Sequence, residues 1–237
     1  MRKHGTTDRK RLAARGVAGA RSPFATYPAC VEPHSLAGSG AAAGEEPPAA
    51  FRAALDAMAT VRPRPEIVLE RIPAPQRLAP WAHAMGAQVY EPDGDEEVEV
   101  ASGRFIVLFD PNGHEAWDGT TRCVAYVSAV TDETLVDDTM FSEVAWSWLT
   151  DALEDAGAGS HAVGGTVTRT ASTRFGDLAG PEHSVEVELR ASWTAEDNGA
   201  LDRHLTAFLE VLGTAAGLPP PGVHLLGPSG RASGETT

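Results

Sequence analysis

The stretch Asp110–Arg122 of this 237-residue chain contains several side chains that could perform chemistry. It runs through two turn-like segments that separate two apolar segments, a position where functional residues are common. In a catalytic interpretation, His114 or Glu115 would act as a general base and Arg122 would hold an anionic group. The candidate residues are Asp110, His114, Glu115, Trp117, Asp118 and Arg122.

The same stretch has a purely structural interpretation. Asp110-Pro-Asn-Gly113 is a common turn sequence, and Asp118-Gly119 is another. A calcium loop would need oxygen ligands at alternating positions, where Pro111 and Trp117 do not supply them. We therefore keep three interpretations open for the stretch: a scaffold turn, a loop that binds a ligand or partner, and a catalytic loop.

Other catalytic motifs are missing from the sequence. No H-x-x-x-H or C-x-x-C spacing suggests zinc, and no glycine-rich phosphate loop follows an apolar segment. The G-x-S-x-G pattern of many serine hydrolases is also absent. We expect neither a metal nor a cofactor, and we lean against an enzyme.

Charge is divided unevenly along the chain. Residues 1–44 hold seven basic and two acidic residues, whereas the remainder holds 12 basic and 31 acidic residues. An acidic domain repels phosphate backbones and anionic lipid, so we expect no nucleic-acid binding by the folded part. No apolar run is long enough to span a membrane, and no secretory signal is evident. Because Cys30 and Cys123 are not placed to form a disulfide, we expect a cytoplasmic location.

Apolar periodicity predicts an α+β domain. Residues 105–109 are apolar on both alternating faces, which predicts a strand buried on both sides. Residues 185–193 alternate strictly between apolar and polar, which predicts a strand with one wet face. We expect further strands at 66–72, 124–130 and 166–175, helices at 51–58, 136–149 and 201–212, a single helical turn at 81–87 and an acidic loop at 91–99.

These elements follow the order α-β-β-β-α-β-β-α. Strands in adjacent pairs with helices between the pairs predict an antiparallel sheet that carries helices on one face. The order strand, strand, helix occurs at 103–153 and again at 162–212, which suggests a ββα pseudo-repeat. We expect one domain at 49–226, a disordered basic tail at 1–48 and a disordered C-terminal tail at 227–237.

The helix expected at 136–149 carries two tryptophans. Its apolar stripe is predicted to contain Val136, Met140, Val144, Trp148 and Leu149. Trp146 lies about 200° from Trp148 around a helix, so it cannot share that stripe. Trp146 is therefore either covered by another element or exposed at an association surface, such as a homodimer contact.

Several long segments resemble one known family: PEIVLERIPAPQRLAP, GRFIVLFDPNGHEAWDGTTRCVAYV, EVAWSWLTDALE, GGTVTRTASTRFGD and VELRASWT. It is an uncharacterised actinobacterial family, a domain of unknown function numbered three thousand. The resemblance covers about 51–227 and implies no activity, cofactor or catalytic residue. The element order is also similar to that of the small acidic dimeric chaperones of type III secretion, although no motif is shared.

The sequence thus favours a non-enzymatic cytoplasmic module that binds another protein, as an adaptor or a chaperone-like protein, and that forms a homodimer. The alternative is a small-molecule-binding protein or an enzyme that uses the Asp110–Arg122 loop.

Overall fold

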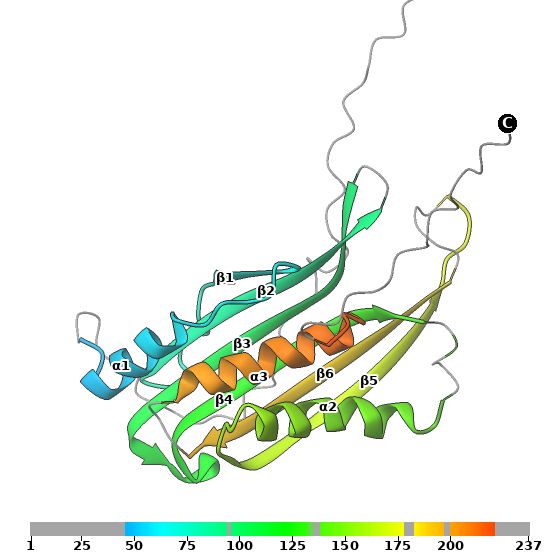
Figure 1. Cartoon of the computed structure of the whole chain (residues 1–237). Coiled ribbons are helices and arrows are strands. Elements are labelled where there is room, and N and C mark those ends of the chain that lie inside the picture. Colours follow the sequence, from blue (N-terminus) through cyan, green and yellow to red (C-terminus); the bar gives the residue numbers. More distant parts are fainter. Residues whose placement is uncertain are drawn as a thin grey trace, which may run out of the picture. The chain divides into compact units, whose positions relative to one another are not determined.

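In the residues that the structure describes, an open antiparallel sheet carries three helices on one face (Figure 1). A computed structural model describes residues 46–93, 96–132, 134, 138–177, 183–196 and 200–220. The elements are α1 (Ala49–Met58), β1 (Ile67–Arg71), β2 (Trp81–Asp93), β3 (Glu96–His114), the 3₁₀ turn η2 (Glu115–Trp117), β4 (Gly119–Thr131), α2 (Phe141–Asp155), β5 (Ser160–Thr173), β6 (His183–Ala195) and α3 (Leu201–Ala215). The α+β class and the antiparallel sheet are confirmed.

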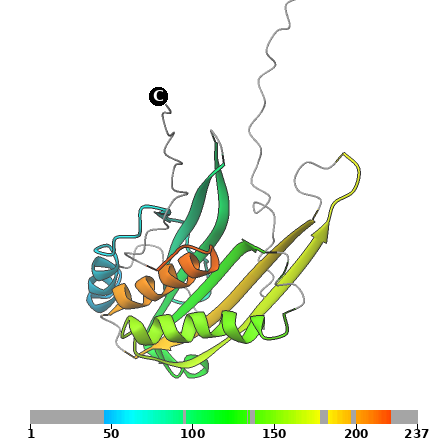
Figure 2. The ribbon, with the colours of Figure 1, turned by 45° about the vertical axis from the view of Figure 1, so that its right-hand side comes forward.

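The six strands found in the described part of the chain lie in the order β1-β2-β3-β4-β6-β5. All neighbours are antiparallel, and the pair β4–β6 places Cys123 opposite Trp193. The expected ββα repeat is present as β3-β4-α2 and β5-β6-α3. Each helix packs on strands of the other repeat, because α3 lies on β3 and β4 whereas α2 lies on β5. Figure 2 shows α2 and α3 side by side on the same face of the sheet.

The core lies between this sheet face and the helices. Phe105 of β3 stacks on Phe208 of α3 with ring centroids 5.5 Å apart, and Phe51 of α1 stacks on Phe109 at 5.1 Å. Trp193 is fully buried, and its indole nitrogen donates to Nδ1 of the buried His204 at 3.0 Å. Burial of a tryptophan is favourable when its N–H finds an acceptor, as it does here.

The predicted wet and dry faces of β6 are confirmed. Val185, Val187, Leu189, Ala191 and Trp193 are buried, and the residues between them are half-buried or exposed up to Ser192. On β3 the expectation of burial on both sides holds only in part, because Leu108 is buried whereas Ile106 is half-buried.

Two local predictions were wrong, and both concern β2. Residues 81–87 form the first half of this strand instead of a helical turn, because residues 81–89 pair with residues 101–109 of β3. The stretch 91–99 is not a loop, since β2 continues to Asp93 and β3 begins at Glu96. The expected helices and strands all occur in the expected order, with β2 as an additional strand before β3. This additional strand weakens the comparison with type III secretion chaperones.

The predicted apolar stripe of α2 was also largely wrong. The buried residues are Phe141, Ala145, Leu149 and Leu153, whereas Met140 is 56% exposed and Val144 is 48% exposed. Leu149 is confirmed as a core residue, and Trp148 is half-buried with its ring edge against Phe141. Cys30, Val136 and both predicted tails, apart from residues 46–48, lie outside the described residues.

Candidate functional site

The Asp110–Arg122 stretch is the hairpin connection between β3 and β4. Strand β3 continues to His114 and β4 begins at Gly119, so the loop proper is the turn η2 and Asp118. Asp110 therefore lies within a strand, and its carboxylate accepts a hydrogen bond from the Asn112 amide at 2.9 Å. This bond is a local turn interaction of the kind expected for an aspartate followed by Pro-Asn-Gly.

His114 serves the turn through both its ring face and its ring nitrogen. Nδ1 accepts a hydrogen bond from the Ala116 amide at 3.2 Å, and the ring stacks on Trp117 with centroids 4.5 Å apart. A neutral imidazole has one accepting nitrogen, and here that nitrogen is Nδ1. The other nitrogen then carries the proton, so this arrangement does not suit His114 as a general base. Glu115 is exposed, and its carbonyl accepts from the Asp118 amide at 3.2 Å.

Asp118 closes the turn with a left-handed backbone conformation, φ 55°. Its carbonyl oxygen lies 2.9 Å from Nε2 of His161 at the start of β5. Its carboxylate is 3.7 Å from the same nitrogen, so protonation of His161 would add an ion pair on the surface. The turn is thus linked to a strand more than 40 residues away in sequence.

Arg122 is the most heavily hydrogen-bonded of the candidates. On the sheet face without helices, Nη1 donates to the Ala162 carbonyl and to Thr194 Oγ1, each at 3.0 Å, and Nη2 donates to Ser192 Oγ at 2.7 Å. Thr194 in turn donates to the Trp117 carbonyl. Partial burial lowers the pKa of the guanidinium from its ordinary value, although it stays charged at neutral pH.

These contacts gather the candidates only in part. Thr194 links Arg122 to the Trp117 carbonyl, and His161 contacts Asp118. Asp110 and His114 form hydrogen bonds with neighbouring residues of the turn. Within the described ranges, no group of three or more His, Cys, Asp or Glu side chains is placed to hold a metal ion. The arrangement connects the hairpin tip to β5 and β6, whereas the sequence predicted only local turns.

Trp146 lies apart from the hairpin tip, on α2 above β5. It is half-buried, and a Cβ atom added to Gly165 would come within 2.8 Å of its indole ring. The ring therefore rests on the strand at a position that has no side chain. The prediction that Trp146 and Trp148 lie on different sides of the helix agrees with this placement, although both pack partly against the core.

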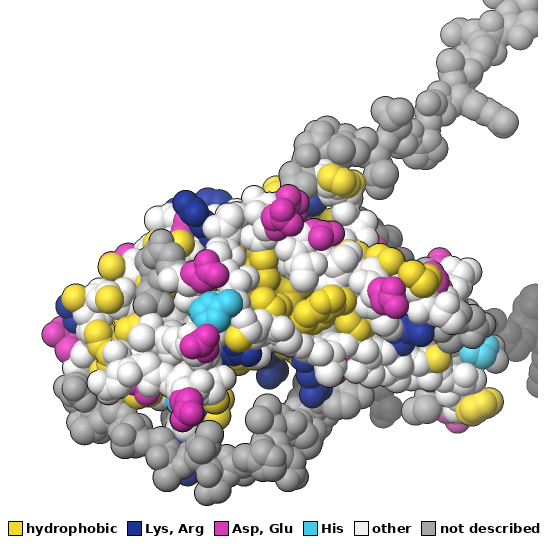
Figure 3. Space-filling model, turned by 90° about the horizontal axis from the view of Figure 1, so that it is seen from below, with side chains coloured by type: hydrophobic (Ala, Val, Ile, Leu, Met, Phe, Trp, Pro, Cys, Tyr) yellow, Lys and Arg dark blue, Asp and Glu magenta, His cyan; other side chains and the backbone are white. Residues whose placement is uncertain are grey.

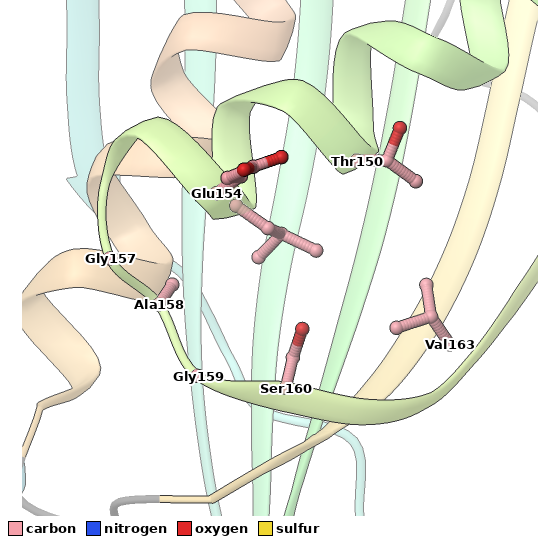
Figure 4. Close-up of a pocket in the computed structure, with 8 residues that line it drawn as sticks. Thr150, Glu154, Gly157, Ala158, Gly159, Ser160 and Val163 are labelled. Atoms are coloured by element: carbon pink, nitrogen blue, oxygen red, sulfur yellow. The ribbon is translucent and has the colours of Figure 1, made fainter.

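A depression of about 370 Å³ lies between the end of α2 and the start of β5. Thr150 and Glu154 reach it from the helix, and Ser160 and Val163 reach it from the strand (Figure 4). The remaining lining residues are Leu153, Gly157, Ala158 and Gly159. The depression could not be predicted from the sequence, because these residues form no motif and meet only when α2 turns back onto β5.

The outer strands of the sheet differ in how their edges are protected. β1 is five residues long, contains Glu70 and Arg71, and is followed by Pro73 and Pro75. β5 is 14 residues long and contains no Asp, Glu, Lys or Pro, and most of its side chains are exposed. Charges, prolines and short length are the usual protection of an edge strand. β1 therefore has this protection, whereas β5 has only Arg169 and a register shift against β6 between His161 and Gly164.

Hydrophobic side chains accompany this edge. Figure 3 shows hydrophobic atoms gathered at the middle of the side on which Figure 1 places α2 and β5, with acidic groups around them. Val163 of β5 is 36% exposed, and Phe175 just beyond the strand is 78% exposed. We refer to β5 together with Trp146 as the β5 edge.

The protein is thus a small α+β protein with an open antiparallel sheet. The chain belongs to a family described as a protein of unknown function (DUF3000), whose match covers residues 47–224. This finding confirms the family named from the sequence. No curated protein matches the chain, and no solved structure matches it. In the part that the structure describes, none of the helices has the length and apolar character needed to cross a membrane.

Proposed function

We propose that this chain is a non-enzymatic, cytoplasmic protein-binding module, an adaptor or chaperone-like protein, that receives its partner at the β5 edge. The observation that carries the proposal is the long outer edge of β5, which contains no carboxylate, lysine or proline. An edge strand presents unpaired backbone N–H and C=O groups, and the backbone of another polypeptide segment pairs with such a row by strand addition.

The half-exposed apolar groups beside the strand add to this argument. Trp146 and Val163 lie against or on β5, and the depression lined by Thr150 and Ser160 opens next to them. In strand addition, backbone hydrogen bonds supply affinity, and alternate side chains of the added segment supply specificity by filling neighbouring pockets. An added strand could contact the indole and this depression with alternate side chains.

The hairpin contacts favour this function over an enzyme. Arg122 already donates to three neutral acceptors, and the accepting nitrogen of His114 is engaged with the turn. One observation favours the alternative of a ligand-binding loop, because no carboxylate pairs with Arg122 among the described residues. If the alternative holds, His114→Ala and Asp118→Ala leave stability nearly intact and abolish ligand binding.

The proposal is tested by photo-crosslinking in the cells that make this chain. A photoreactive benzoylphenylalanine replaces Thr168, which is exposed on β5, and the matched control replaces Val68, which is 50% exposed on β1. We expect adducts that contain a polypeptide at position 168 and none at position 68, identified by mass spectrometry. Absence of adducts at position 168, or equal adducts at both positions, would contradict the proposal.

A further inference from the structure

We infer that the partner at the β5 edge is a second copy of this chain, paired as antiparallel β5 strands about a two-fold axis perpendicular to the sheet. The inference rests on the proposed function, because it uses the same edge. Such pairing would join two six-stranded sheets into one continuous sheet, with the helices of both copies on the same face.

The side chains of β5 are complementary to themselves. In an antiparallel pair, residues directly opposite each other lie on the same face of the sheet. The face without helices carries Thr166, Thr168 and Thr170, which are opposite Arg190, Glu188 and Glu186 of β6 and are exposed. A two-fold axis near Thr168 would therefore place threonines opposite threonines. Thr–Thr pairs across strands are favourable.

Charge also favours a second copy at this place. Residues 45–237 hold 31 acidic and 12 basic residues, so two copies repel each other over most of their surface. β5 contains no carboxylate and one arginine, Arg169. Two copies of Arg169 would face each other only if the axis passed through that residue. The two domains can thus approach along β5 without bringing acidic strand residues together.

The contrast between the edges explains why such pairing would stop at a dimer. A symmetric interface uses the same surface on both copies, whereas a head-to-tail contact can continue into a filament. Pairing of β5 with β5 would cover the less protected edge of each copy. The outer strand left at each end of the joined sheet would be β1, which is short, charged and followed by prolines.

Trp146 lies where this dimer would exclude water. Its ring rests on Gly165, which lies on the helix side of β5, opposite Ala191 of β6 and three residues before Thr168. The second strand would add backbone and small side chains beside the indole of each copy. Half-exposed tryptophans are enriched at such contacts because they bury a large apolar area.

Sedimentation velocity of the full chain from 1 to 100 µM tests the inference. The chain has a mass of 24.9 kDa, and we expect a species of twice that mass. Thr166→Lys with Thr168→Lys places charges along the edge, and we expect it to weaken dimerisation at least tenfold. The matched control Val68→Lys on β1 should leave the dimer unchanged. Circular dichroism establishes that each variant is folded.

A second measurement keeps the inference independent of the lysine variants. In a Cys30→Ser background, Thr168→Cys should form a disulfide-linked dimer under mild oxidation, while Val68→Cys should not. A chain that stays monomeric at 100 µM, or a dimer that neither the lysines nor the cysteines affect, would overturn the inference. If a monomeric chain still gives adducts with other polypeptides at position 168, the proposed function stands and only the second copy is wrong. If position 168 gives no adduct at all, both fail.

Discussion

Replacement of Arg122 by alanine should destabilise the fold by about 2 kcal/mol, because its guanidinium links β4 to β5 and β6. The side chain donates three hydrogen bonds, to Ala162, Thr194 and Ser192. Hydrogen bonds that involve a charged group contribute roughly 1.5–3 kcal/mol each. Arg122 is only half-buried, so water replaces part of this interaction after truncation, and the three bonds are not additive. Thr194 is fully buried and its hydroxyl hydrogen is already used in the bond to the Trp117 carbonyl. After truncation, the hydroxyl oxygen would lose the N–H donor of Arg122. Most of the cost should therefore arise at that hydroxyl.

Urea and thermal unfolding measure this effect directly. For a domain of this size, 2 kcal/mol corresponds to a fall in Tm of about 4–8 °C. The control is Arg104→Ala, an exposed arginine opposite Tyr126 that makes no hydrogen bond or ion pair in the residues described, and it should change stability by no more than about 0.5 kcal/mol. If Arg122→Ala were as stable as Arg104→Ala, the guanidinium would not be structural. The ligand-binding interpretation of the loop would then become the better one.

Four further predictions concern the edge, the sheet and the core. Gly165→Ala should cost several kcal/mol in thermal unfolding, because its Cβ would lie 2.2 Å from the Arg190 carbonyl, whereas Gly164→Ala, with nothing within 4 Å, should be nearly neutral; equal effects would contradict the packing. Trp146→Glu should weaken self-association in sedimentation without unfolding the domain; a variant that stays dimeric would count against the interface. In a Cys30→Ser background, Cys123 should resist iodoacetamide at pH 8 until the protein unfolds, since burial raises the pKa of its thiol; rapid alkylation of folded protein would refute this. Burial raises the pKa of Tyr126 to about 12, together with the Glu188 carboxylate, which accepts a hydrogen bond from the hydroxyl at 2.8 Å. The contribution of Tyr126 to stability is therefore complete below pH 10 and is lost as pH rises toward 12. The loss of stability between these pH values should be absent from the alkaline unfolding of Tyr126→Phe.

The sequence predicted best those elements whose pattern reflects a single boundary between core and solvent. Residues 185–193 alternate because one face of β6 meets the helices and the other does not, and the structure confirms each apolar position as buried. Helix α3 was equally clear, since Leu201, Leu205, Phe208 and Leu212 form one apolar stripe and are all buried. In both cases local periodicity and tertiary packing give the same answer.

The errors arose where tertiary pairing outweighs local preference. Residues 81–87 are rich in alanine, which favours helix, yet Ala84 and Ala87 are buried in β2. On α2, the series Met140, Val144, Trp148 and the series Phe141, Ala145, Leu149 have the same spacing. Spacing alone cannot choose between two such stripes, and the choice is made by the strands that α2 covers.

The candidate site shows the same limit. Turn chemistry at Asp110 and Asp118 was visible in the sequence, because aspartates beside proline, asparagine or glycine form local hydrogen bonds. The partners of Arg122 were not, since Thr194 and Ser192 are 72 and 70 residues away in the chain. The β5 edge could not be predicted for a related reason. A strand is an edge strand because it has a neighbour on one side only, and the order of the strands in the sheet is not evident from the sequence.

The exchange of helices between the two ββα repeats bears on how the chain is made. Helix α3 is the last described element, and it covers β3 and β4, which are synthesised some 70 to 100 residues earlier. Until α3 leaves the ribosome, the apolar face of these strands, including Phe105, lacks the helix that buries it. Neither repeat can then complete its core alone, so folding should be a single late event that depends on the whole chain. A nascent chain that ends at α2 would expose this face and should require protection from aggregation during synthesis.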